Sequence, residues 1–182
     1  GDGRYDDNAP TFTDKFYLEL EVKRSAIFWR DNRAFESDCG ALISMQQFCF
    51  TTALSYISEI KRLCDSRTIG LTIVLIPDEL QVSKPLQAEV IAASGLAGAS
   101  FDFALPNRLL HAKFDELKID YIDLIAEFSA RSLDKRLYRP NDSHWNIAGN
   151  QLAAEIILQH LSAQLGSSQP ANPSIVSFPR LP

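Results

Sequence analysis

The run from Leu71 to Ile76, closed by Pro77, constrains the fold more than any other segment of the chain. Its β-branched residues follow one another with almost no polar break, which predicts a short strand buried on both faces. Strands of that kind belong to parallel sheets, whose crossover connections are usually helices. A helical pattern precedes the run, because apolar residues recur at spacings of three and four between Gln46 and Cys64. Together these two features predict an α/β fold.

Other segments fit the same class. The sequence predicts a second strand over 119–124 and further helices over 16–29, 84–93, 106–117 and 147–161. Residues 1–14 are expected to form a loop and 33–44 a linker. A sheet usually has about five or six strands, so either weaker strands escape the pattern or the chain is the later part of a larger domain. The second explanation fits a chain that does not open on Met and implies a domain incomplete at its N-terminal side. We therefore assign residues 1–165 to the later part of one domain and 166–182 to a flexible tail rich in proline and serine.

Charge and composition exclude several classes of protein. The formal net charge is -5, with 18 Lys and Arg against 23 Asp and Glu, and no basic block occurs, so a nucleic-acid partner is not expected. The longest apolar run is too short to cross a bilayer. The chain opens on Gly1 rather than Met, so the native start is expected upstream.

The three cysteines leave the cellular compartment open. Cys49 and Cys64 lie in a helical pattern, which favours buried free thiols. A bridge between Cys39 and Cys49 is the alternative if the protein is exported.

The segment with the clearest chemical signal leads into the last helix. Asp142 lies two residues before His144, in a predicted turn, and such a carboxylate can orient an imidazole so that its other nitrogen acts as a base. Two alternatives stay open. Asp142 or Ser143 could cap the helix while His144 packs on Trp145. Asp142 and His144 could also ligate a metal, although the sequence offers no third ligand at a useful spacing.

The stretch Asp-Ser-His-Trp-Asn-x-x-Gly over 142–149 resembles the C-terminal block of the SGNH (GDSL-like) hydrolases. It is most similar to the branch with a D-x-H-W-N block that includes the alginate O-acetylation proteins. The resemblance implies a three-layer α/β/α, flavodoxin-like fold and a Ser-His-Asp triad. In that triad Asp142 would be the orienting acid and His144 the general base.

The chain departs from the family's pattern at the nucleophile. The family's serine lies in a Gly-Asp-Ser turn, but the opening Gly1-Asp2-Gly3 has glycine in place of serine. Ser25 lies in a helical stretch and Ser143 stands beside His144, so neither is expected to be the nucleophile. We expect the serine to come from outside this segment, upstream. The resemblance also implies an asparagine in the oxyanion hole, for which Asn8 is the candidate.

The resemblance implies a serine-type ester hydrolase or O-acetyltransferase that acts on an acyl or saccharide ester. That chemistry needs neither a metal nor an organic cofactor. The expected partners are the ester substrate, a membrane-associated acyl donor and a second copy of the chain, and the expected location is extracytoplasmic, either periplasmic or secreted. The alternative function is a non-catalytic module of hydrolase-like fold that binds carbohydrate or protein.

Overall fold

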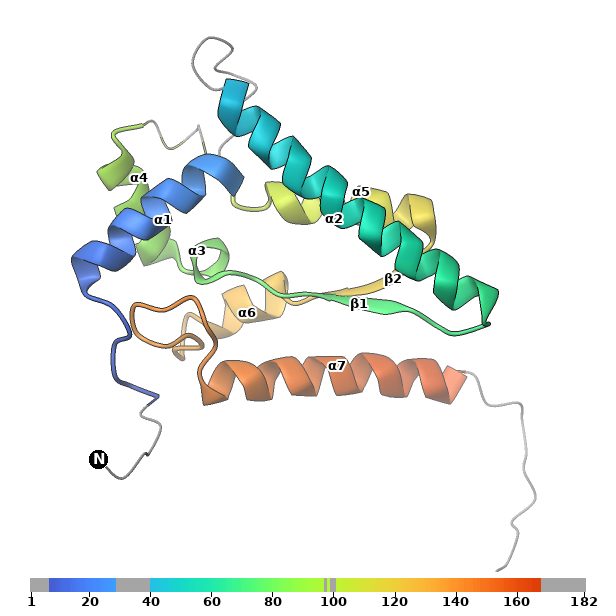
Figure 1. Ribbon diagram of the computed structural model, residues 1–182. Coiled ribbons are helices and arrows are strands. Elements are labelled where there is room, and N and C mark those ends of the chain that lie inside the picture. The colour runs from blue at the N-terminus through green and yellow to red at the C-terminus, as the bar shows by residue number, and fades with distance from the viewer. Residues whose placement is uncertain (1–6, 29–39, 97, 99–100, 168–182) are drawn as a thin grey trace, which may run out of the picture.

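The computed structural model describes residues 7–28, 40–96, 98 and 101–167 (Figure 1). In chain order the elements are α1 (Asp14–Phe28), α2 (Gly40–Ser66), β1 (Thr72–Leu75), α3 (Glu79–Val82), α4 (Lys84–Ser94), α5 (Leu105–Leu117), β2 (Asp120–Asp123), α6 (Ile125–Arg131) and α7 (Ile147–Ser167).

The two strands form a parallel pair, as predicted. Thr72 of β1 faces Asp120 of β2 and Leu75 faces Asp123, and the connection between the strands contains α3, α4 and α5. Both strands run toward the end of the molecule where α1, α3 and α4 gather (Figure 1). Open α/β sheets bind their ligands at the carboxyl ends of the strands, so this is the end at which to look for a site.

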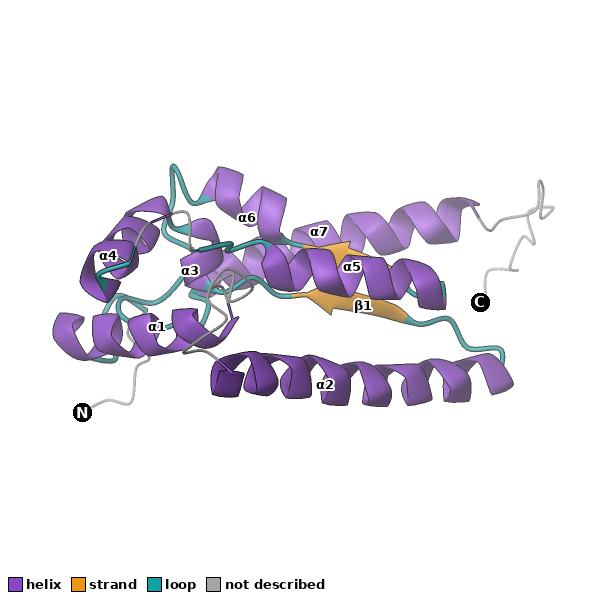
Figure 2. Cartoon of the chain, turned by 90° about the horizontal axis from the view of Figure 1, so that it is seen from above, coloured by secondary structure: helices purple, strands orange, loops and turns teal. Residues whose placement is uncertain are grey.

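Helices lie on both sides of the strands. In the two views α2 and α7 stand on opposite sides of the pair (Figures 1 and 2). This layered arrangement confirms the α/β class, with two strands in the part of the chain that the structure describes. Within the same ranges every helix is too short or too polar to cross a membrane.

The core consists of two clusters. One joins β2 to α6, α7 and the loop between these helices, and the other packs α1 against α3 and α4. The buried members of the first are Val82, Ile122, Leu124, Phe128, Leu137, Tyr138, Leu152 and Ala153. Those of the second are Tyr17, Leu80, Leu86 and Val90. The second cluster holds α1 beside the carboxyl end of β1.

Several expectations about these elements were wrong. All four residues of β1 are half-buried rather than buried, because β2 covers only one edge of this strand. Helix α2 begins at Gly40, so the end of the expected linker is helical. Helix α7 extends to Ser167, two residues into the expected tail. Residues 1–6 of the expected loop, 33–39 of the expected linker and 168–182 of the expected tail lie outside the described residues.

The cysteines also differ from the expectation. Cys49 is exposed and Cys64 is half-buried, and both are free thiols, whereas Cys39 lies outside the described residues. The helical spacing was correct, but among the described residues no element packs on the face of α2 that carries Cys49 closely enough to bury it.

Candidate active site

The Asp142–His144 motif lies on a tight loop between α6 and α7. Tyr138 and Trp145 form an antiparallel bridge across its base, and the Asn146 N–H donates to the carbonyl of Leu137 at 3.0 Å. Asn141 in the turn has φ 50°, a left-handed conformation that asparagine tolerates better than most residues. The hydroxyl of Tyr138 donates to the carbonyl of Pro77 at 2.7 Å, which ties the loop to the carboxyl end of β1.

The structure brings the predicted acid and base into direct contact. Asp142 Oδ1 lies 2.5 Å from Nδ1 of His144 and also accepts from the backbone N–H of His144 at 3.0 Å. Because an ionised carboxylate can only accept, Nδ1 carries the proton. Asp142 Oδ2 accepts from the hydroxyl of Thr11 at 2.6 Å and from the guanidinium of Arg139 at 3.4 Å.

The two side chains have opposite exposures. Asp142 is only 4% exposed. Burial would raise the pKa of its carboxyl, but the hydrogen bonds from Thr11 and from His144 outweigh burial, so the pKa lies below its ordinary value. The side chain of His144 is 84% exposed, and its Nε2 has no partner among the residues that the structure describes. An anchored acid and an open base nitrogen are what a triad requires; the catalytic roles themselves remain predictions.

The capping alternative is wrong for this loop. His144 does not pack on Trp145, whose ring instead lies 4.8 Å from that of Phe128. The first turn of α7 is satisfied by other side chains. Asn146 Oδ1 accepts from the Gly149 N–H at 2.9 Å, and Asp7 Oδ2 accepts from the Ile147 N–H at 2.9 Å.

The segment before α1 crosses the loop and contacts it at several points. The Thr11 N–H donates to the carbonyl of Pro140 at 3.1 Å, and the amide of Asn141 donates to the carbonyl of Phe12 at 3.0 Å and to Asp14 at 2.6 Å. Sequence reasoning missed Thr11, because 131 positions separate it from Asp142 and no local spacing connects the two.

The candidate oxyanion residue lies on the same segment. Asn8 is exposed in a turn, and its neighbour Asp7 contacts the backbone of α7. Its role in an oxyanion hole remains a prediction.

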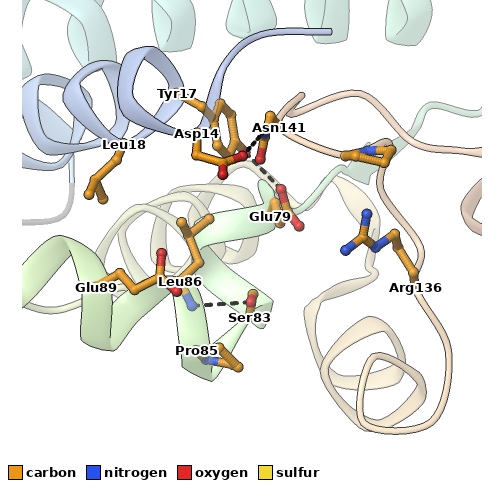
Figure 3. A pocket seen from close by; sticks show the side chains of 11 residues that line it. Asp14, Tyr17, Leu18, Glu79, Ser83, Pro85, Leu86, Glu89, Arg136 and Asn141 are labelled. Carbon is orange, nitrogen blue, oxygen red and sulfur yellow. Dashed lines mark hydrogen bonds between the residues drawn. The ribbon is translucent and has the colours of Figure 1, made fainter. Parts of the chain in front are cut away.

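A cavity of about 320 Å³ opens between α1, α4 and the loop (Figure 3). Its lining residues are Asp14, Tyr17, Leu18, Glu79, Ser83, Pro85, Leu86, Glu89, Arg136, Pro140 and Asn141. Glu79 lies between Tyr17 and Arg136 in Figure 3, and the Tyr17 hydroxyl donates to it at 2.7 Å. Burial raises the pKa of the Glu79 carboxyl. The hydrogen bond from Tyr17 and the charge of Arg136 lower it by less, so the pKa lies above its ordinary value. The lining of the cavity is therefore largely polar. It includes Pro140 and Asn141, the two residues before Asp142.

A charged cluster lies behind this cavity. Arg24 binds Glu21 at 2.6 Å and also Asp78, which caps α3. Glu21 is fully buried, and its Oε2 has no hydrogen-bond partner within the described ranges. Burial, with the nearby Asp78 carboxylate, raises the pKa of Glu21 to about 7 against the opposing effect of Arg24.

The serine on α1 cannot serve as a nucleophile where it stands. Ser25 is 1% exposed, and its hydroxyl donates to the carbonyl of Val22 at 2.8 Å. The side chain is therefore committed to the helix, as expected. In the described part of the chain no group of three or more His, Cys, Asp or Glu side chains could hold a metal ion.

One comparison with known proteins agrees with the fold. The family model of the SGNH hydrolase-like domain, acetyltransferase AlgX, matches residues 43–176. No curated protein sequence and no solved structure is significantly similar to the chain. The match begins at residue 43, inside α2, and includes both strands, the Asp142–His144 loop and α7. It supports a hydrolase-like or acyltransferase-like function, and it places the chain in the SGNH hydrolase-like family of acetyltransferase AlgX.

Proposed function

We propose that this chain supplies the acid and the base of a serine-type acyl-transfer site, which hydrolyses an acyl or saccharide ester or moves an O-acetyl group. The observation that carries the proposal is the 2.5 Å contact between Asp142 Oδ1 and His144 Nδ1, together with the exposure of the imidazole. The match to an acetyltransferase family supports the same chemistry.

In the proposed reaction the His144 Nε2 takes the proton of a serine hydroxyl as the serine oxygen attacks the ester carbonyl. Asp142 stabilises the imidazolium that forms. When the tetrahedral intermediate collapses, His144 returns the proton to the leaving alkoxide and an acyl-enzyme remains. Water or a sugar hydroxyl then attacks the acyl group while His144 takes its proton. The bond to the serine oxygen breaks, and His144 returns the proton to the serine. The serine comes from outside residues 1–182, and Asn8 is the candidate donor to the oxyanion.

The cavity beside the loop supports a hydroxyl-bearing substrate. Three of its lining residues are carboxylates and one, Arg136, is a guanidinium, so hydrogen-bonding groups surround the space. Such a lining suits the alcohol part of a saccharide ester better than a long alkyl chain.

The test is ester hydrolysis by the full native protein, measured with p-nitrophenyl acetate. His144→Ala is expected to lower kcat about 10³-fold or more, because the serine loses its base. Asp142→Asn should lower kcat by a similar order with little change in KM. His111→Ala is the matched control, since His111 forms another His–Asp pair, with Asp123 at 2.7 Å, away from this loop.

An unchanged rate in His144→Ala would contradict the proposed triad. A native protein that hydrolyses no ester and transfers no acetyl group would instead favour the binding module.

A further inference from the structure

We infer that Thr11 is a positioning residue for this acid–base pair, because its hydroxyl holds the Asp142 carboxylate in the orientation that presents Oδ1 to His144. The inference rests on the proposed function, since it assigns a role within the same site. It adds to the site a residue that lies 131 positions from Asp142 in the sequence.

The two oxygens of Asp142 have separate partners. Oδ1 faces the backbone N–H and the Nδ1 of His144, at 3.0 and 2.5 Å. Oδ2 faces the hydroxyl of Thr11 at 2.6 Å. A carboxylate turns readily about its terminal bond, because that torsion has broad minima. The contact to Thr11 therefore gives the carboxylate a further point of attachment, on Oδ2, which keeps Oδ1 oriented toward His144.

Thr11 makes the shorter of the two contacts to Oδ2. Its hydroxyl makes a short hydrogen bond to a charged oxygen, the class that is roughly twice as strong as a neutral one. The other donor, the Arg139 guanidinium, is 3.4 Å away, which is long for a hydrogen bond. Loss of the Thr11 hydroxyl would leave the longer contact to hold the carboxylate.

Thr11 is itself held against the loop that it supports. Its backbone N–H donates to the carbonyl of Pro140, and Asn141 donates to the carbonyl of the next residue, Phe12. Threonine also has a restricted χ1, so its hydroxyl points in few directions. Thr11 is an exposed residue, and its hydroxyl donates to the acid.

The experiment compares Thr11→Val, Thr11→Ser and Thr13→Val in the full native protein. Valine keeps the shape of threonine but lacks the hydroxyl, and serine restores the hydroxyl. Thr13 is the matched control, because its hydroxyl accepts from the Phe16 N–H at 3.3 Å and does not bind Asp142. We expect Thr11→Val to lower kcat about ten-fold with KM unchanged. Removing a residue that hydrogen-bonds a functional side chain typically lowers activity by about that factor. Thr11→Ser should keep most of kcat, and Thr13→Val should keep all of it.

A second readout separates positioning from folding. In the proton NMR spectrum the Nδ1–H of His144, bonded to Asp142, should give a resolved downfield signal. Thr11→Val should shift or broaden that signal while the Tm of the protein changes little, and Thr11→Ser should restore it. If Thr11→Val does not fold, Thr11→Ala replaces it in both measurements.

The outcomes distinguish this inference from the proposed function. If His144→Ala abolishes activity while Thr11→Val keeps both the wild-type kcat and the wild-type signal, Thr11 has no positioning role and the inference is wrong. If His144→Ala has no effect on activity, the proposed function fails, and an unchanged Nδ1–H signal in Thr11→Val would overturn the positioning of Asp142 independently.

Discussion

At the scale of single residues, each residue named in the Asp-x-His-Trp-Asn-x-x-Gly motif has a physical role in the loop. Trp145 packs against Phe128 in the core, and Asn146 caps α7 through the Gly149 N–H. Gly149 allows the closest approach, because a Cβ there would lie 2.3 Å from the carbonyl oxygen of Leu137. The motif therefore combines the Asp142–His144 pair with three residues that stabilise the loop on which the pair lies.

Gly149→Ala is expected to lower the free energy of unfolding by about 3 kcal/mol, because the backbone of Leu137 must move to admit a methyl group. Urea denaturation followed by circular dichroism measures the change. Gly70→Ala is the control, since a Cβ at Gly70 meets nothing within 4 Å. Equal midpoints for the two variants would show that the Leu137 carbonyl is free to move.

How far the sequence predicts the site depends on sequence distance. Asp142 and His144 are two residues apart, so their contact could be foreseen from the turn that holds them. The partner on the other side of the carboxylate, Thr11, comes from a loop at the far end of the chain. Thr11 and Asp142 come together only when that segment packs on the loop, and no periodic pattern in the sequence indicates this contact.

At the scale of elements, α1 is attached to the carboxyl end of β1 through charged side chains. Arg24 bridges Glu21 on its own helix and Asp78 at the start of α3, while Tyr17 binds Glu79. Four ionisable groups therefore interact electrostatically with Glu21: Tyr17, Arg24, Asp78 and Glu79. The cluster holds one wall of the cavity beside the loop, so its protonation affects how firmly that wall is attached.

Glu21 makes stability depend on pH. Its pKa is raised in the folded state from the ordinary 4.5 to about 7, so the folded protein favours the protonated form. The resulting stabilisation is complete below pH 4.5 and is lost as pH rises through 7, by at most about 3 kcal/mol. Glu21→Gln should remove most of this loss in urea titrations between pH 4.5 and 8.

Glu19→Gln is the control for that titration, because Glu19 lies on the same helix with its side chain 57% exposed. A wild-type protein and a Glu21→Gln variant with parallel pH profiles would contradict the assignment.

The sequence predicts elements with a clear apolar pattern better than short helices. The apolar run at 71–76 and the spacing in 46–64 were sufficient to place β1 and α2. Helices α3 and α6 have four and seven residues, too few for a helical period to stand out. The burial of β1 was overestimated for a different reason, because burial depends on which elements cover a strand and not on the strand's own residues.

At the scale of the whole molecule, the described residues leave much apolar surface uncovered. Phe48, Tyr56 and Ile60 on α2 are exposed, as are Leu158 and Leu161 on α7. These helices stand on opposite sides of a sheet with two strands (Figure 2). Helices normally cover both faces of a parallel sheet. A sheet of two strands is narrow, so it buries only part of the apolar surface of α2 and α7.

A polypeptide of residues 1–182 is therefore expected to self-associate as its concentration rises, because large exposed apolar patches drive association. Leu158→Lys should weaken this association, since Leu158 is 66% exposed on α7 and a charge there must be desolvated in any contact that covers the helix. Sedimentation velocity over a range of concentrations measures the effect.

Leu133→Lys is the matched control, because Leu133 is 79% exposed in the loop after α6 and not on either long helix. If α7 carries the interacting surface, Leu158→Lys lowers the apparent association constant about ten-fold or more, the equivalent of about 1.4 kcal/mol, and Leu133→Lys leaves it unchanged. Equal effects of the two lysines would mean that association follows total exposed apolar area and not the face of α7. A polypeptide that stays monomeric at every concentration would contradict the expectation directly.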